Sequence, residues 1–306
     1  MKAMLLTAHG GPEMLRFGDA PDPFAGPGDI VVDVHAASVN AADYKVRLGG
    51  HGGLTFPHIL GRDFSGVVAS VGPGVSDFAV GDAVFGVNDA GQEGAYAEKL
   101  RIKAAIVARK PDRLSHLQAA AMALTGLTAI WAVEDTGQLK KGETILIQGG
   151  AGGVAGFAIQ LAKYLGARVI TTASAANADY VRGLGADRVI DYNAEDFTKV
   201  VHDCDVVFDT VGDAVQARSY SVLKPGGRLV WIAPAPAGFT PPRTDVKVLR
   251  PAVSRDRAHL ERIVALLEAG AVAPPPIVRY ELKDAAEAHR VSEARHLRGK
   301  LVLAVR

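Results

Sequence analysis

The sequence has only one cysteine, Cys204, in 306 residues. A single cysteine excludes an intrachain disulfide and any zinc site built from several cysteines. We therefore expect Cys204 to behave as a small, buried apolar residue. The scarcity of cysteine also favours a reducing compartment, so the expected localisation is cytoplasmic.

The sequence also lacks an excess of charge and long apolar runs. The formal net charge of +1 at pH 7 gives no electrostatic reason to expect a nucleic acid or a membrane as partner. No apolar run reaches the length needed to span a bilayer, and the opening MKAMLLTAHGG lacks the apolar core of a signal peptide. With 48% hydrophobic and 22% charged residues, the composition is typical of a soluble globular protein, and the length allows two domains.

The part of the chain before Ser115 contains short apolar runs separated by turn residues. These runs predict strands, and Asn40 is placed to cap a short helix after the second of them. Frequent turns between short strands predict a compact, barrel-like β domain. The expected strands are residues 1–7, 30–39, 64–71, 83–87 and 96–102, with residues 51–62 irregular.

From Thr144 onward, apolar runs of strand length alternate with helical patterns. This alternation predicts a doubly wound parallel sheet, so the fold class is α/β. The expected strands are residues 144–147, 168–173, 188–191, 205–211, 229–233, 246–249 and 300–305, with a turn at 224–227. The expected helices are residues 115–135, 154–165, 178–184, 195–201, 214–223, 257–269 and 284–294.

A glycine cluster separates the first of these strands from the helix that follows it. Gly150-x-Gly152-x-x-Ala155 fits the dinucleotide-binding fingerprint, with alanine in the third place. Glycines at this turn let the backbone approach a pyrophosphate, and the helix N-terminus offers free N–H groups to it. The alternative is a glycine-rich turn without a ligand. The strand–turn–helix context favours the dinucleotide.

An ordered set of short stretches resembles the medium-chain dehydrogenase/reductase superfamily, and within it the zinc-independent, zeta-crystallin-like quinone oxidoreductases. The resemblance covers nearly the whole chain and implies a GroES-like domain from residues 1–122 and 251–306. A Rossmann NADP-binding domain would lie between them, at residues 123–250. The matching stretches are Val39-Asn40-x-x-Asp43, Gly61-Arg62-Asp63-Phe-Ser-Gly66, residues 123–129 and 149–155, Phe208-Asp-Thr-Val-Gly212, Leu223-Lys-Pro-Gly-Gly-Arg-Leu229 and Gly299-Lys-Leu-Val-Leu303.

The zinc-binding members of the superfamily carry Gly-His-Glu where this sequence has Gly61-Arg62-Asp63. His51 and His58 lie nearby and suggest a two-histidine site. No third ligand stands at a convincing spacing, so they are better interpreted as loop histidines. We expect no bound metal.

The cofactor is expected to be NADPH. NAD-binding folds place an acidic residue about 20 residues after the first glycine, but no acid follows the second strand before Asp179. Ser174 and Asn177 could donate hydrogen bonds to a 2′-phosphate, although simple helix capping would also explain them. The resemblance adds Tyr192, which could equally be an ordinary aromatic, and Arg295 in the tail. Relatives often have lysine near the position of Asn177.

The resemblance also implies contacts to the rest of the cofactor. Thr125 corresponds to the family threonine beside the nicotinamide, although a helix threonine can instead bond to the turn before it. The remaining cofactor contacts are expected at Gly150, Gly152, Gly153, Val154, Val211 and Ala233.

Without zinc, hydrogen-bond donors must stabilise the charge that develops on the substrate oxygen. The candidates are Asn40, Tyr44 and Arg62. Each has an alternative role: Asn40 as a helix cap, Tyr44 as a packing residue, and Arg62 as a surface partner of Asp63 or Glu98.

The expected activity is hydride transfer from NADPH to a quinone or an α,β-unsaturated carbonyl compound. No residue is an obvious acid for protonating carbon, which slightly favours quinones. The alternatives are an enoyl-thioester or 2-alkenal reductase of the same superfamily and a non-catalytic NADPH-binding protein. By analogy with relatives, residues 246–249 are expected to form the edge of a homodimer, although charges beside an edge strand can also block pairing.

Overall fold

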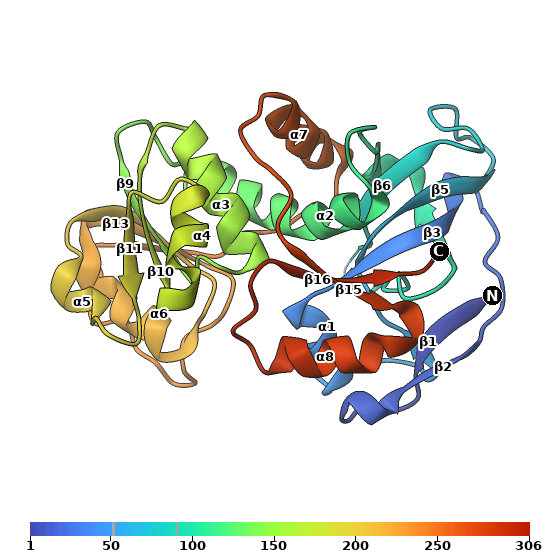
Figure 1. The fold of residues 1–306 in the computed structure, drawn as a ribbon, viewed down its shortest axis with the longest axis horizontal. Helices are drawn as coiled ribbons and strands as arrows, with labels where there is room; N and C mark the ends of the chain where they lie inside the picture. Colours follow the sequence, from blue (N-terminus) through green and yellow to red (C-terminus); the bar gives the residue numbers. More distant parts are fainter. Residues whose placement is uncertain (51–52, 90) are drawn as a thin grey trace. The chain divides into compact units, whose positions relative to one another are not determined.

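The computed structural model describes residues 1–50, 53–89 and 91–306 and divides into two compact units (Figure 1). We call Met1–Leu124, Arg255–Val264 and Pro274–Arg306 the mixed-sheet unit. We call Thr125–Ser254 and Ala265–Ala273 the parallel-sheet unit. The division falls inside two helices, α2 (His116–Ile130) and α7 (Arg257–Glu268).

The mixed-sheet unit is built on a seven-stranded sheet with the order β15-β16-β3-β5-β6-β8, in which β7 also pairs with β3. The central β3 is the longest strand, and valine and isoleucine on it are buried in the core. The last strand of the chain, β16, pairs antiparallel with β3, so the tail completes this sheet. The strands are β3 (Asp29–Val39), β5 (Asp63–Val71), β6 (Ala83–Val87), β7 (Lys99–Lys103), β8 (Val107–Arg109), β15 (Ile277–Glu281) and β16 (Lys300–Ala304).

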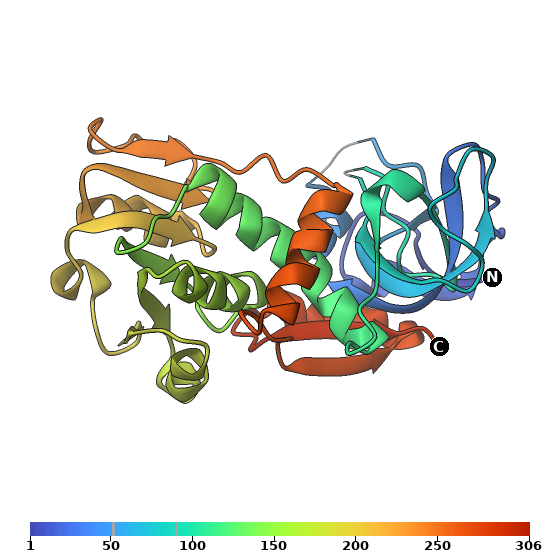
Figure 2. The same ribbon diagram turned by 90° about the horizontal axis from the view of Figure 1, so that it is seen from above.

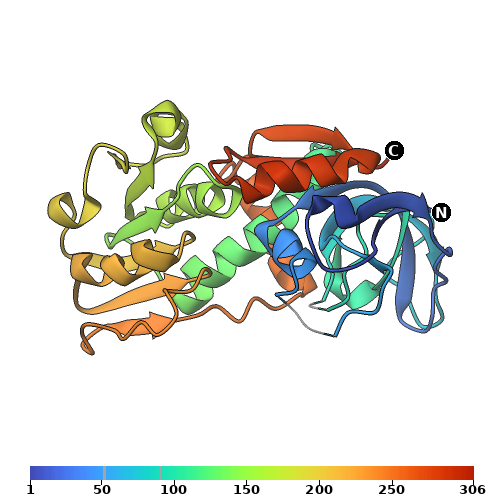
Figure 3. The same cartoon turned by 90° about the horizontal axis from the view of Figure 1, so that it is seen from below.

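A smaller three-stranded sheet has the order β2-β1-β4. Its strands are β2 (Leu15–Asp19), β1 (Lys2–Leu6) and β4 (His58–Ile59). Two helices of this unit, α1 (Ala41–Arg47) and α8 (Ala285–Glu293), lie beside each other although they come from opposite ends of the sequence (Figures 1 and 3). Short 3-10 turns occur at Pro12–Met14, Ala104–Ile106 and Leu282–Asp284.

The parallel-sheet unit has a six-stranded sheet with the order β11-β10-β9-β12-β13-β14, and every pairing is parallel. From β9 the chain adds strands first on one side, β10 and β11, and then on the other, β12 to β14. This change of side in the strand order is typical of a doubly wound fold, so the predicted fold class is confirmed. Figure 2 shows β14 at one edge of the sheet. The strands are β9 (Thr144–Gln148), β10 (Arg168–Ala173), β11 (Arg188–Asp191), β12 (Cys204–Asp209), β13 (Leu223–Trp231) and β14 (Lys247–Leu249).

Helices flank the parallel sheet because its strands are apolar on both faces. One buried cluster joins Leu146 and Val207 of the sheet to Phe197 and Tyr220. Cys204 belongs to the same cluster, which confirms the expectation of a small, buried apolar residue. Burial raises the pKa of its thiol to about 12. The helices are α3 (Gly153–Tyr164), α4 (Ala178–Gly183), α5 (Phe197–Val200) and α6 (Asp213–Ser219), with 3-10 turns at Ala175–Asn177 and Tyr220–Val222.

Most predicted elements are present, and the differences have local causes. Four short strands, β2, β4, β8 and β15, lie where no strand was expected. Of these, β4 and β8 have only two and three residues, too few to show a periodicity. The predicted turn at 224–227 is assigned to β13. Its pairing nevertheless jumps from Leu223 opposite Cys204 to Arg228 opposite Val206, so residues 224–227 bulge out of the ladder.

Helix α2 continues into a π-helical turn, Trp131–Thr136. Together they form one helix of 21 residues that is long and apolar enough to cross a membrane. The sequence shows no continuous apolar run of this length, because Thr125, Thr128 and Glu134 interrupt it. The structure buries 78% of its most apolar window, as expected for the core helix of a globular fold.

Gly66 on β5 provides a test of this packing. A Cβ built at Gly66 would lie 2.1 Å from the carbonyl oxygen of Asp33 on β3. We expect Gly66→Ala to lower the free energy of unfolding by about 1–3 kcal/mol, because the two central strands must move apart. Urea denaturation monitored by circular dichroism would measure this change in the free energy of unfolding. Gly183→Ala is the matched control, since no described atom outside its own helix backbone lies within 4 Å of a Cβ there. Equal losses in both variants would contradict this account.

Candidate active site

The glycine loop follows β9 and leads into α3. The N–H of Gly150 donates to the carbonyl of Thr172 at 2.8 Å, and that of Gly149 donates to the Thr172 hydroxyl at 3.0 Å. A Cβ at Gly150 would lie 2.2 Å from the hydroxyl oxygen of Thr171. Packing against β10 is therefore enough to require glycine at position 150.

Gly152 is not explained by packing. Its backbone has an ordinary extended φ of −73°, and the nearest atom to a Cβ there would be the Gly149 carbonyl oxygen at 3.5 Å. Gly152 is the N-cap of α3, whose first N–H groups have no carbonyl in the preceding turn. A missing side chain in front of these donors leaves the approach open, which fits a pyrophosphate held by Gly153 and Val154.

The next candidate site is the end of β10. The Asn177 amide donates to the Ser174 hydroxyl oxygen at 3.2 Å. Both residues precede helical turns, but in the described part of the chain neither side chain accepts a capping hydrogen bond. The side chains of Ser174 and Asn177 therefore do not cap these helical turns, so capping does not explain their presence. Tyr192, directly after β11, is 46% exposed, and Asp179 is paired with Arg182 on the surface.

The carboxyl ends of β12 and β13 bring two further predicted residues together. Asp209 is buried, and its carboxylate accepts the N–H groups of Val211 and Gly212 at 2.9 and 3.1 Å. Burial raises the Asp209 pKa to about 6 despite these donors. A Cβ at Gly212 would lie 2.8 Å from that of Ala233. Val211 lies beyond the end of β12, in this loop and not in the strand that was predicted to reach it.

Several of the predicted cofactor residues thus lie on the side of the parallel sheet where the carboxyl ends of its strands meet, which is where such folds bind ligands. The glycine loop, Ser174, Val211 and Ala233 lie at these strand ends. Thr125 is buried on α2 in the same unit. Arg295 belongs to the mixed-sheet unit, where it is exposed and has a left-handed backbone φ of 61°.

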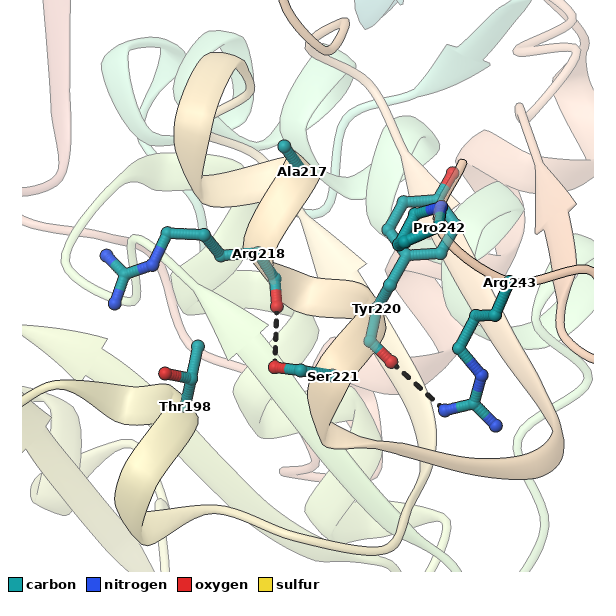
Figure 4. A pocket seen from close by; sticks show the side chains of 7 residues that line it. All are labelled: Thr198, Ala217, Arg218, Tyr220, Ser221, Pro242 and Arg243. Atoms are coloured by element: carbon teal, nitrogen blue, oxygen red, sulfur yellow. Dashed lines mark hydrogen bonds between the residues drawn. The ribbon is translucent and has the colours of Figure 1, made fainter. Parts of the chain in front are cut away.

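A pocket of about 420 Å³ opens at the other end of these strands, among segments that precede β12, β13 and β14. Its two arginines are already paired, Arg218 with Asp196 and Arg243 with Asp245. Figure 4 shows the Arg243 guanidinium turned to the carbonyl of Tyr220. This pocket therefore lies at the opposite end of the strands from the predicted cofactor residues.

In the mixed-sheet unit, Asn40 stands between β3 and α1. Its amide nitrogen donates to the Asp63 carboxylate at 2.7 Å, and its amide oxygen accepts from the Lys300 ammonium at 2.6 Å. Lys300 also donates to the carbonyl of Val39 at 2.9 Å. Burial lowers the pKa of Lys300, and the nearby charges of Asp63 and Asp43 oppose that shift. Both ends of the Asn40 amide are therefore engaged within the protein.

Asp43 is fully buried three residues into the same helix. Its Oδ2 accepts the N–H of Asn40 at 2.8 Å and the hydroxyl of Tyr96 at 2.9 Å. Burial raises the pKa of Asp43 to about 6, and the neighbouring charge of Asp63 adds to the increase. The hydrogen bonds from Asn40 and Tyr96 act in the opposite direction.

Arg62 lies at the end of the segment before β5 and is 9% exposed. Its Nη2 is 3.3 Å from Oε1 of Glu93, and its Nε is 4.0 Å from Oδ1 of Asp43. The expected partners Asp63 and Glu98 are wrong, because Arg62 lies beside these two other acids. Burial alone would raise the pKa of Glu93, but His58 and Arg62 outweigh it and hold the value at about 2. Tyr44 is buried on α1.

Four residues of this polar cluster, Asp43, Glu93, Tyr96 and Lys300, were not among the predicted site residues. Asp43 and Lys300 stand inside two of the stretches that carry the family resemblance. Tyr96 was attributed to a strand, but it lies before β7 and points its hydroxyl at Asp43. Nothing in the sequence alone indicates that Glu93 lies beside Arg62.

The donor set for a metal is poor in this unit. His58 lies 3.5 Å from Glu93, and His51 lies outside the described residues. Among residues 1–50, 53–89 and 91–306, no group of three histidine, cysteine, aspartate or glutamate side chains is placed to hold a metal ion.

Comparison with known proteins places both units in one family. Residues 26–112 match the alcohol dehydrogenase GroES-like domain, and residues 184–303 match the domain described as zinc-binding dehydrogenase. The chain is 32% identical to a quinone oxidoreductase of Pseudomonas aeruginosa, with 99% of each chain covered. It is also 32% identical to the chloroplastic NADPH-dependent alkenal/one oxidoreductase of Arabidopsis thaliana, over 99% of this chain and 79% of that relative.

The crystal structure of the Escherichia coli quinone oxidoreductase complexed with NADPH is similar over the full length of both chains, with a TM-score of 0.92 and 29% identity. Two matched domains, full-length relatives and a shared fold all agree with the motifs in the sequence. The chain belongs to the medium-chain dehydrogenase/reductase superfamily, in its quinone oxidoreductase group, and is an oxidoreductase.

Proposed function

We propose that this protein is an NADPH-dependent, zinc-free reductase of quinones or α,β-unsaturated carbonyl compounds. The observation that carries the proposal is Gly152, a glycine that no protein contact requires, in front of the first N–H groups of α3. When bound, the dihydronicotinamide supplies the hydride. The protein supplies binding, orientation and electrostatic stabilisation.

NADPH is favoured over NADH by the groups at the end of β10. Ser174 and Asn177 present hydroxyl and amide groups where an NAD-binding fold has an acid. A carboxylate there would repel a 2′-phosphate, whereas these groups can donate hydrogen bonds to it. The related quinone oxidoreductase of Escherichia coli was crystallised with NADPH.

Arg62 is the strongest candidate for stabilising the charge on the substrate oxygen. It is the only one of the three predicted donors, Asn40, Tyr44 and Arg62, with a guanidinium charge, and its Nε has no hydrogen-bond partner within the described residues. Asn40 has both amide ends engaged by Asp63 and Lys300. We therefore assign Asn40 a supporting role and Arg62 the role of donor.

We propose that the protein binds no zinc because the residues at this position are poor metal ligands. Arg62 occupies the middle position of Gly61-Arg62-Asp63, and an arginine cannot ligate zinc. The acids beside it, Asp43 and Glu93, are engaged by Tyr96, Arg62 and His58.

An enone or alkenal reductase is the second candidate, favoured by the similarity to the alkenal/one oxidoreductase of Arabidopsis thaliana. An enoyl-thioester substrate and a non-catalytic NADPH-binding role are the remaining alternatives. Purified protein tested with NADPH against 1,4-benzoquinone, phenanthrenequinone, an alkenal and an enoyl thioester separates them. An alkenal or thioester reduced faster than every quinone supports the second candidate. Tight NADPH binding with no oxidation above the uncatalysed rate supports the non-catalytic role.

We further propose a cytoplasmic homodimer. The edge strand β14 carries Val248, which is 42% exposed, and unpaired edge strands are templates for pairing with a second chain. Sedimentation equilibrium of the purified protein tests the oligomeric state.

Arg62→Met tests the proposed donor. We expect kcat/KM for the best acceptor to fall about 100-fold, because removal of one donor to a developing oxyanion typically costs this much. The dissociation constant of NADPH should not change, since the glycine turn, Ser174 and Asn177 belong to the parallel-sheet unit and not to the unit of Arg62. Arg279→Met, at an exposed ion pair with Glu281, is the control. Full activity in a correctly folded Arg62→Met protein would contradict the assignment.

Gly152→Ala tests the proposed pyrophosphate cradle. The backbone at Gly152 accepts alanine and leaves room for a Cβ within the protein. The fold should therefore keep its melting temperature while the NADPH dissociation constant rises roughly tenfold or more. Isothermal titration calorimetry measures the affinity. Unchanged affinity would show that no ligand occupies this turn, and Gly183→Ala controls for a general effect of glycine replacement.

Asn177→Lys tests the proposed phosphate site. An ammonium near a 2′-phosphate should lower the NADPH dissociation constant about tenfold, the effect of one charge-assisted hydrogen bond. Affinity for NADH should stay the same. Thr244→Lys, an exposed position in the same unit, adds the same charge elsewhere. If Asn177→Lys increased the affinity for NADPH and NADH equally, the 2′-phosphate would not bind at position 177.

A further inference from the structure

A chain of four buried polar side chains begins and ends on α1 and passes through His289 of α8 and Tyr96. The Nε of Arg47 donates to Nδ1 of His289 at 3.3 Å. The other ring nitrogen of His289, Nε2, lies 3.3 Å from the hydroxyl of Tyr96. Tyr96 donates to Oδ2 of Asp43 at 2.9 Å. All four residues have no exposed surface.

The direction of every hydrogen bond in this chain follows from Arg47. A guanidinium can only donate, so Nδ1 of His289 must accept. Burial, reinforced by the charge of Arg47, lowers the pKa of His289 to about 3, so the ring is neutral and its one proton sits on Nε2. Nε2 therefore donates to the Tyr96 oxygen, and the Tyr96 hydrogen is left to point at Asp43. Arg47 is itself held by Gly10 and Glu293.

The chain ends at Asp43, one of the two carboxylates beside Arg62; the other, Glu93, lies 3.3 Å from the guanidinium. Oδ2 of Asp43 takes the hydrogen bonds from Tyr96 and from the N–H of Asn40. Oδ1 has no hydrogen-bond partner among the described residues and lies 4.0 Å from Nε of Arg62, which has none either. Fixing Oδ2 fixes Oδ1 as well, because the two oxygens share one plane.

We propose that Arg47, His289 and Tyr96 are positioning residues, which hold Asp43 as the carboxylate that orients the Arg62 guanidinium toward the substrate oxygen. The proposal rests on the proposed function, since it takes Arg62 as the donor. None of the three touches the substrate. They act through Asp43, which is buried beneath Arg62.

This role makes the ionisation of Asp43 measurable in catalysis. The charged and titratable groups around it are Arg62, Asp63, Tyr96 and Lys300, and His289 stands behind Tyr96. Activity that needs the carboxylate rises as the pH increases through the Asp43 pKa, which burial raises to about 6. The hydrogen bond from Tyr96 lowers that pKa, so its loss must shift the rising limb of the pH profile to higher pH.

The alternative is that the chain only ties α8 to α1 and stabilises the unit. A purely structural tie lowers stability and the amount of folded protein when it is cut. It does not move the pH dependence of the remaining active protein. The position of the rising limb therefore separates the two roles.

The experiment compares Tyr96→Phe, His289→Leu and His289→Gln in the full-length protein. Leucine removes both polar contacts of His289, whereas glutamine keeps one acceptor for Arg47 and one donor for Tyr96. We expect Tyr96→Phe and His289→Leu to lower kcat about 10- to 100-fold and to shift the rising limb of kcat against pH to higher pH. KM for NADPH should stay constant. His289→Gln should recover kcat and return the limb toward that of the unmodified protein.

The proposal would be overturned if the rising limb of kcat against pH stayed at the same pH and the loss of activity matched the loss of folded protein. So would a His289→Gln protein that is no better than His289→Leu. His202→Gln, at an exposed histidine in the other unit, is the matched control.

Failure of the proposed function is distinguished by a measurement without turnover. The Asp43 carboxyl can be titrated by NMR of protein labelled with ¹³C-aspartate, with Asp43→Asn to assign its signal. A higher pKa in Tyr96→Phe than in the unmodified protein supports the hydrogen-bond chain even if no acceptor is reduced. An unchanged pKa overturns it even if a quinone is reduced.

Discussion

Burying a charge without a partner is costly in a protein interior, and the mixed-sheet unit buries several around the start of α1. Asp63 is satisfied by Ser38 and Asn40, and Asn40 in turn by Lys300. This requirement links β3, β5, α1 and β16 more specifically than apolar packing could. Apolar contacts tolerate small shifts, whereas a buried ammonium and carboxylate hold their partners at defined distances.

The same requirement separates the roles of the polar residues in this unit. Asn40 and Lys300 satisfy each other and leave little for a substrate. Arg62, in contrast, has two carboxylates nearby but a hydrogen-bond donor without a partner among the described residues. Charge neutralisation holds it in place while its hydrogen-bonding capacity remains incomplete. Such a group is suited to bind an oxygen that gains negative charge during a reaction.

The sequence was sufficient to predict both sheets, because apolar runs of strand length and the glycine fingerprint are local signals. It could not predict β4 or β8, which are two and three residues long. Arg62 was identified from its place in a family motif, but its partners Asp43 and Glu93 were not. Their proximity depends on tertiary folding, which no spacing along the chain encodes. His289 stands 242 residues from Arg47 and carried no signal of its own.

The last strand, β16, supplies Lys300 to a sheet whose central strand, β3, begins at Asp29. During synthesis on the ribosome, residues 125–254 emerge as one continuous segment and can pair their strands while the tail is still being made. The mixed sheet must wait longer, because Lys300, whose ammonium satisfies Asn40 beside Asp63, is made after the whole of that segment. Until Lys300 is made, the first strands lack one partner of this buried polar cluster, and incompletely paired strands are prone to aggregation.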